Sequence, residues 1–209
     1  MRSHESDPTG NESLALERIA FFSDAVIAIA LTLLAIDLRI PDVQGVDDAA
    51  FMRMLGDLGP HYFAFLISFG VVALYWRAHH RMFRYIERWD GGLLGVNMVF
   101  LFVVVQQPLL ASMLGSYGNL SSATAIYALG LAALGFSSFG MWLYVLRRHL
   151  LTPGLPAPYV RYTSVRSGGV ATAFLLSAGL ALISPLAVQV SWILITLSSF
   201  LLRRKMLPD

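Results

Sequence analysis

The sequence contains no cysteine and few charged residues. The absence of cysteine excludes disulfide bonds, thiol catalysis and cysteine-ligated metal sites. Charged residues make up only 13% of the 209 residues, about half of the roughly 25% that a soluble domain carries. The net charge is only +2, and no basic patch on a soluble face is visible, so nucleic-acid binding is not expected.

Long apolar runs take the place of the missing charges. Hydrophobic residues make up 56% of the chain, and a helix of roughly 20 apolar residues spans the hydrocarbon core with its backbone groups bonded internally. We therefore predict an all-α membrane protein with six transmembrane helices. Four predicted spans cover residues 19–38, 61–76, 93–114 and 123–146. The apolar segment 168–202 is too long for one ordinary span, and Pro185 divides it into two short helices with a turn at Ser184–Pro185.

The basic residues predict the orientation of these spans. Of the fifteen lysines and arginines, only Arg39 and Arg53 fall in a loop on the outer side. The positive-inside rule then places both termini in the cytoplasm of a multi-pass plasma-membrane protein. The predicted organisation is a cytoplasmic tail at 1–17, a six-helix domain at 18–205 and a C-terminal tail at 206–209. The inner basic residues are Arg2, Arg18, Arg77, Arg81, Arg84, Arg88, Arg147, Arg148, Arg161, Arg166, Arg203, Arg204 and Lys205.

The loop between the first two spans and the aromatic residues at the inner span ends are the next notable features. The loop between the first two spans is acidic, and it is either an ordinary solvated loop or a vestibule that concentrates cations. The aromatic residues at the inner ends of the second and third spans are interpreted as headgroup anchors, which is a structural role. These aromatic residues are Tyr75, Trp76, Tyr85 and Trp89.

Asp24 is the most unusual residue of the first span, because it lies roughly one and a half turns inside the apolar run. A carboxylate at this depth normally faces a partner, water or a pathway. Arg18 is on the wrong face of the same helix to pair with it. Alternatively, Ser23 or Asp24 is a simple helix N-cap. Candidate partners from another helix or subunit, at the same membrane level, are Arg77, His79, His80 and Arg81.

The pattern R-x-x-x-F-S-D at the start of the first span resembles the signature of the transmembrane protein 175 family of potassium channels. Its four fixed residues are Arg18, Phe22, Ser23 and Asp24. The following AVIAIALTLLAIDLRIP resembles the first helix of that family, and the segment YWRAHHRMF at 75–83 resembles the end of its second helix. The resemblance covers essentially the whole chain.

The resemblance implies a potassium-selective, leak-type channel: a homotetramer whose central pore is lined by four first helices. The family lacks the carbonyl filter of ordinary potassium channels, and no T-V-G-Y-G occurs here. By this inference Ile29, Leu33 and Ile36 form the pore constriction, and Thr32 adds a hydroxyl ring that contributes to selectivity. Arg18, Ser23 and Asp24 would form a polar network below the constriction, with Phe22 packing the helix against its neighbours.

Other functional classes fit the residues less well. His79 and His80 are adjacent, so they point about 100° apart on a helix and do not share one metal ion. Spans three to six contain no acid or base, which argues against an intramembrane enzyme. The main alternative is a secondary transporter of a cation or small solute, but no convincing internal repeat is present. We expect no cofactor and no metal. The expected partners are potassium and other monovalent cations, membrane lipid and further copies of the chain.

Overall fold

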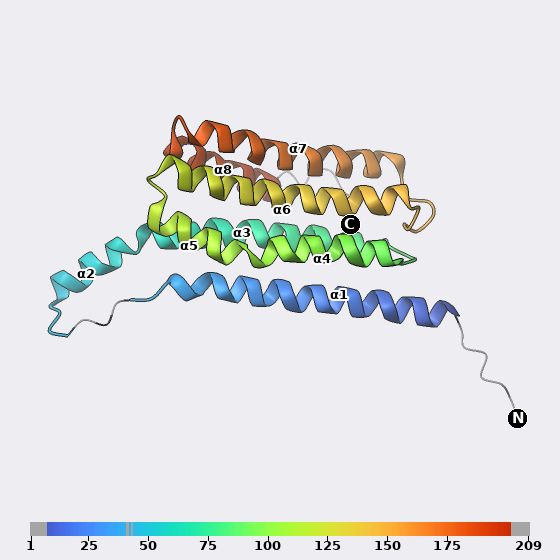
Figure 1. The fold of residues 1–209 in the computed structure, drawn as a ribbon, viewed down its shortest axis with the longest axis horizontal. Helices are drawn as coiled ribbons and strands as arrows, with labels where there is room; N and C mark the ends of the chain where they lie inside the picture. The colour runs from blue at the N-terminus through green and yellow to red at the C-terminus, as the bar shows by residue number, and fades with distance from the viewer. Residues whose placement is uncertain (1–7, 41, 43, 202–209) are drawn as a thin grey trace, which may run out of the picture.

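The computed structural model describes residues 8–40, 42 and 44–201, which form helices joined by short turns and loops. The first helix, α1, continues into a short 3₁₀ helix, η1 (Figure 1). The bounds of the helices are Pro8–Leu33 (α1), Leu34–Asp37 (η1), Asp48–Asp57 (α2), Gly59–Phe83 (α3), Gly91–Val105 (α4), Gln107–Tyr117 (α5), Ser121–Arg147 (α6), Ala157–Ala181 (α7) and Pro185–Leu201 (α8).

The long helices pack in three layers (Figure 1). α1 lies at one edge and contacts α3 and α4, which form the middle layer together with α5. The third layer contains α6, α7 and α8, and α7 runs along α6 for most of its length. α2 projects from one end of the bundle and buries none of its residues. One edge of α1 therefore faces away from the rest of the subunit.

Within the described residues, four segments are long and apolar enough to cross a membrane: Ser13–Ile36, Gly59–Phe83, Gly91–Tyr117 and Ser121–Arg147. α8 contributes a shorter apolar stretch, Pro185–Ile195. Large hydrophobic side chains on these helices are exposed in the isolated subunit. Lipid or neighbouring subunits must cover these side chains, because so large an apolar surface is unfavourable in water. The chain is therefore an all-helical, multi-pass membrane protein.

Pro108 interrupts the predicted third span. The span predicted at 93–114 lies within the membrane-length segment Gly91–Tyr117, which the structure divides into α4 and α5. Proline has no N–H to donate to the carbonyl four residues earlier, and its ring clashes with that turn. The side-chain amide of Gln107 donates to the carbonyl of Val103 (3.2 Å), so a side chain supplies a donor where the helix breaks.

The predicted fifth span begins too late. Arg161 and Arg166 were assigned to a loop, whereas α7 begins at Ala157 and carries both of them. Long arginine side chains extend toward the interface from a helix, so they do not end it. The predicted break near Ser184–Pro185 is confirmed, because α7 ends at Ala181 and α8 begins at Pro185. Arg203, Arg204 and Lys205 lie outside the described residues.

Two other helices also extend beyond their predicted bounds. α1 begins at Pro8, inside the segment assigned to the N-terminal tail, and the proline occupies its first helical position. α3 continues past Trp76 to Phe83, so Arg77, His79, His80 and Arg81 are all helical. A hydropathy pattern detects where the apolar part of a helix ends, and the helix itself continues while the residues favour it.

The loops after α3 and after α6 are joined at one end of the bundle. Ile86 and Leu151 form an antiparallel bridge. The backbone N–H of Glu87 donates to the carbonyl of Leu150 (2.9 Å), and that of Thr152 donates to the carbonyl of Tyr85 (2.8 Å). The two loops that the charge pattern placed on the same side therefore lie together.

Candidate pore helix and its polar layer

The face of α1 that contacts the subunit core is a narrow stripe. Ser23, Ile27, Ala30 and Leu34 are all buried and follow one another at spacings of four, three and four. This spacing is the repeat of a single helical face. Three of the four residues are apolar or small, so α1 packs closely against α3 and α4. Ser23 brings the only hydroxyl to this stripe.

The hydroxyl of Ser23 belongs to a buried chain of hydrogen bonds across three helices. It donates to the carbonyl of Ile19 (2.8 Å) and accepts from Nδ2 of Asn97 (2.9 Å). Oδ1 of Asn97 lies 2.9 Å from Nε2 of His79. An amide oxygen only accepts, so Nε2 of His79 carries the proton. Ser23, Asn97 and His79, hereafter the polar layer, join α1 to α4 and α3.

Aromatic rings hold His79 in place. Its ring stacks on Phe83, with centroids 4.4 Å apart, and on Phe100, with centroids 5.3 Å apart. Stacking fixes the plane of the imidazole, and the bond to Asn97 fixes its rotation. His79 is buried together with Asn97 and Ser23, so the polar layer is a rigid, water-excluded contact.

Asp24 lies beside this layer and has a partner that the sequence did not indicate. The indole N–H of Trp76 donates to Oδ1 of Asp24 (2.8 Å). The ring of His80 lies next to that indole, with centroids 5.8 Å apart. His79, another proposed partner of Asp24, instead reaches Ser23 through Asn97.

The remaining residues of the signature lie on the outside of the subunit. Arg18 is exposed and makes no hydrogen bond or ion pair with the part of the chain that the structure describes. Half of the surface of Phe22 is exposed. Arg77 and Arg81, also proposed as partners of Asp24, line a cavity between α3 and α7. The two signature residues that remain exposed are therefore available to another subunit.

The side of α1 and η1 opposite the buried stripe carries the predicted constriction residues, with Ile36 in η1. Ile29, Leu33 and Ile36 are 58%, 41% and 48% exposed. Thr32 is also exposed, and its hydroxyl donates to the carbonyl of Ile29 (2.7 Å). This bond occupies the hydroxyl proton, and the oxygen can still accept a hydrogen bond. The four residues, hereafter the open face, are exposed in the isolated subunit.

Asn97 and Trp76 are the residues that sequence reasoning missed. From the sequence alone, Asn97 has no assigned role and Trp76 is interpreted as a headgroup anchor. A signal for Asn97 was present, because a polar side chain inside an apolar helix normally has a specific partner. No comparable signal distinguishes Trp76 from the neighbouring aromatic residues.

The fold and the polar layer define a class: a helical membrane protein whose first helix is anchored on one side and uncovered on the other. Comparison with known proteins gives the family. The model of the endosomal/lysosomal potassium channel TMEM175 matches residues 18–108, which include the polar layer and the open face. A potassium channel of Streptomyces collinus is 34% identical over 172 residues, covering 80% of this chain and 82% of that protein. The chain belongs to the TMEM175 family, which is a family of ion channels.

Solved structures agree with this assignment. The crystal structure of a lysosomal potassium-selective channel TMEM175 homolog from Chamaesiphon minutus superimposes with a TM-score of 0.79 at 26% identity, covering 90% of this chain and 97% of that chain. A further sequence relative is the bovine endosomal/lysosomal proton channel TMEM175, which is 40% identical over 84 residues, covering 37% of this chain and 18% of that protein.

Proposed function

We propose that this chain is one subunit of a homotetrameric, potassium-selective leak channel of the plasma membrane, with four open faces lining the pore. The observation that carries the proposal is the uncovered apolar face of α1, on a helix whose other face is tied to its own subunit by the polar layer. The relatives from Streptomyces collinus and Chamaesiphon minutus are both named as potassium channels.

Each subunit would cross the membrane six times, with both termini in the cytoplasm. Four spans meet the length and composition expected of a membrane helix, and α7 and α8 would supply the fifth and sixth. The joined loops after α3 and α6 support this topology, because both carry arginines and lie at the same end of the bundle.

Rings of Ile29, Leu33 and Ile36 would form a constriction that contains no charge. A narrow apolar ring closes a pore by dewetting, and a small outward movement of each helix lets water and cations return. Thr32 is exposed on the same face, and its hydroxyl oxygen would supply a ring of ligands for a partly dehydrated potassium ion.

Arg18 and Phe22 would contact the neighbouring subunit, while Asp24 would hold α1 in register through Trp76. A pore would need both the contacts between subunits and a fixed rotation of α1 within each subunit. The polar layer fixes the rotation of α1 about its axis, so the constriction residues of all four subunits face the same axis. Rotation by one residue, about 100°, would replace them with a different set of side chains.

The deciding experiment is cation flux from liposomes that contain the purified protein. A potassium channel gives electrogenic efflux that follows the Nernst potential, with potassium favoured over sodium and with caesium compared in parallel. A secondary transporter gives a saturable flux at a far lower turnover, and that result would contradict the proposal.

Proton conduction is a second candidate, because several vertebrate relatives are named proton channels. The same liposomes test it with an entrapped pH indicator. Acidification that requires the protein under a pH gradient, measured without potassium, indicates a proton pathway. An unchanged internal pH restricts conduction to the larger cations.

A further inference from the structure

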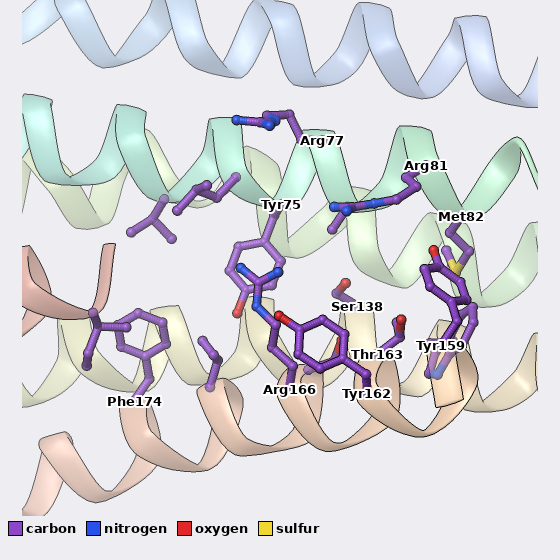
Figure 2. A pocket seen from close by; sticks show the side chains of 17 residues that line it. Tyr75, Arg77, Arg81, Met82, Ser138, Tyr159, Tyr162, Thr163, Arg166 and Phe174 are labelled. Atoms are coloured by element: carbon purple, nitrogen blue, oxygen red, sulfur yellow. The ribbon is translucent and has the colours of Figure 1, made fainter. Parts of the chain in front are cut away.

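A cavity of about 120 Å³ lies between α3 and α7, away from the open face of α1 (Figure 2). A single water occupies roughly 10–15 Å³ on the same measure, so the cavity holds a group the size of several waters. Figure 2 shows Tyr75 extending from α3 toward α7 and Arg166 extending from α7 toward α3. Neither residue has a role in the proposed pore.

The polar end of the cavity is strongly basic. Arg77, Arg81 and Arg166 line it together, and no aspartate or glutamate is among the described residues that line it. Arg81 lies close enough to the other two arginines for their charges to repel its own. Figure 2 shows Arg166 between α3 and α7 and Arg77 on the side of α3 that faces α1. Guanidinium groups are a usual recognition element for a phosphate, because each presents several N–H donors in a planar fork.

The tyrosines add hydroxyl groups to the same space. Tyr159 and Tyr162 line the cavity from α7. The hydroxyl of Tyr75 is buried and has no hydrogen-bond partner within the described chain. A buried hydroxyl without a partner costs free energy, so its presence in this cavity indicates that a ligand completes the site.

The other end of the cavity is apolar and lies deeper in the bundle. Val71 and Phe174 also line it. On α3, Val71 precedes Arg77 by about 9 Å, and on α7, Phe174 follows Arg166 by about 12 Å, at 1.5 Å per residue. The two helices are antiparallel, so both displacements point away from the basic loops. A polar inner end and an apolar deep end match a lipid.

We propose that this cavity, the inner basic pocket, binds the phosphate headgroup of an anionic phospholipid from the inner leaflet. Arg81, Arg166 and Tyr75 contact the phosphate, Arg77 adds positive charge at the rim, and the acyl chain follows the apolar end toward Phe174. Anionic lipids concentrate in the cytoplasmic leaflet, and each arginine near that surface contributes about a fivefold gain in binding. The site is distinct from the pore and depends only on the inner end of the bundle facing the cytoplasm.

The test uses full-length protein in detergent, with unfolding temperature measured against increasing phosphatidylglycerol. We expect a saturable rise with phosphatidylglycerol, no rise with phosphatidylcholine, and little effect of glycerol 3-phosphate at equal concentration. Arg81→Gln and Arg166→Gln each weaken the apparent affinity about fivefold, and the corresponding lysine variants recover part of it. Arg161→Gln is the matched control, because Arg161 is exposed on α7 outside the cavity.

Three outcomes would overturn the proposal. Equal weakening by Arg161→Gln would mean diffuse attraction to the surface. Full stabilisation by glycerol 3-phosphate alone would mean a site for soluble phosphate. No difference between phosphatidylglycerol and phosphatidylcholine would mean that the pocket has no anionic ligand. The readout is binding, so a protein that binds phosphatidylglycerol and carries no potassium current would contradict only the channel function.

Discussion

The two faces of α1 differ in what covers them. The inner face is buried and carries Ser23, which bonds to Asn97 and through it reaches His79. The opposite face is largely apolar and exposed, with Ile29 58% and Leu33 41% exposed in the described part of the chain. Polar side chains therefore lie inside the protein, and apolar side chains lie where a pore is proposed.

The placement of polar contacts inside and apolar side chains outside matters because hydrogen bonds are directional and apolar contacts are not. A polar contact between helices defines one rotational setting, whereas a leucine face would pack at several. Hydrogen bonds offset the free-energy cost of burying the polar groups of Ser23 and Asn97. The same bonds fix the rotation of α1. The open face then presents a defined set of side chains without making any directional contact of its own.

Loss of the Asp24 carboxylate should have the largest effect. A hydrogen bond to a charged group contributes about 1.5–3 kcal/mol, and the contact with Trp76 would occur four times in a tetramer. We expect Asp24→Ala to lose the tetramer on a sizing column. Asp24→Asn keeps an acceptor for the indole and should retain it. A stable Asp24→Ala tetramer with altered ion selectivity would instead assign Asp24 a direct pore role.

Asn97→Ala should destabilise the protein by about 1–3 kcal/mol, because it removes partners from both Ser23 and His79 in a buried layer. Thermal unfolding in detergent measures this change. The matched control is Ser137→Ala, since the Ser137 hydroxyl donates only to Leu134 on its own helix (3.0 Å). Equal shifts for both variants would show that the polar layer has no special contribution.

Leu33→Ser on the open face should leave unfolding nearly unchanged and raise potassium flux about threefold, roughly 0.7 kcal/mol at 1.4 kcal/mol per factor of ten. A hydroxyl lowers the dewetting barrier and weakens the preference for potassium over sodium. Ile29→Ser should behave in the same way. Leu176→Ser is the control, because Leu176 is an exposed leucine on α7. Unchanged currents in both open-face variants would contradict the assignment of the constriction.

The sequence predicts those features of the molecule that local composition determines. The apolar runs and the break before Pro185 depend on nearby residues, and the structure confirms both. The partner of Asp24 was not, because it depends on how α1 and α3 are rotated relative to each other. The helical start of α7 was not predicted, because Arg161 and Arg166 lower the local hydropathy to a value typical of a loop.

An exposed polar cluster provides the weakest test of the contrast between buried and exposed polar contacts. Asp90 caps α4 by accepting from the N–H of Leu93 (2.7 Å) and accepts from the hydroxyl of Tyr144 (2.9 Å). It also pairs with Arg148 at 3.3 Å, where the two side chains are 27% and 62% exposed. These contacts, the Leu93 N–H foremost, lower the pKa of Asp90.

A lowered carboxyl pKa stabilises the fold above the unfolded value of about 3.9, and this contribution is lost as the pH falls through the folded value. Asp90→Asn preserves the cap and removes the charge, so it should cost only about 0.2–1 kcal/mol at neutral pH, as exposed ion pairs do. The difference from the wild type should be constant between about pH 5 and 8 and shrink as the pH falls below the unfolded value of about 3.9. If Asp90→Asn lost as much folding stability at neutral pH as Asn97→Ala, burial would not distinguish the two clusters. The inference that the polar layer fixes α1 would then lose its support.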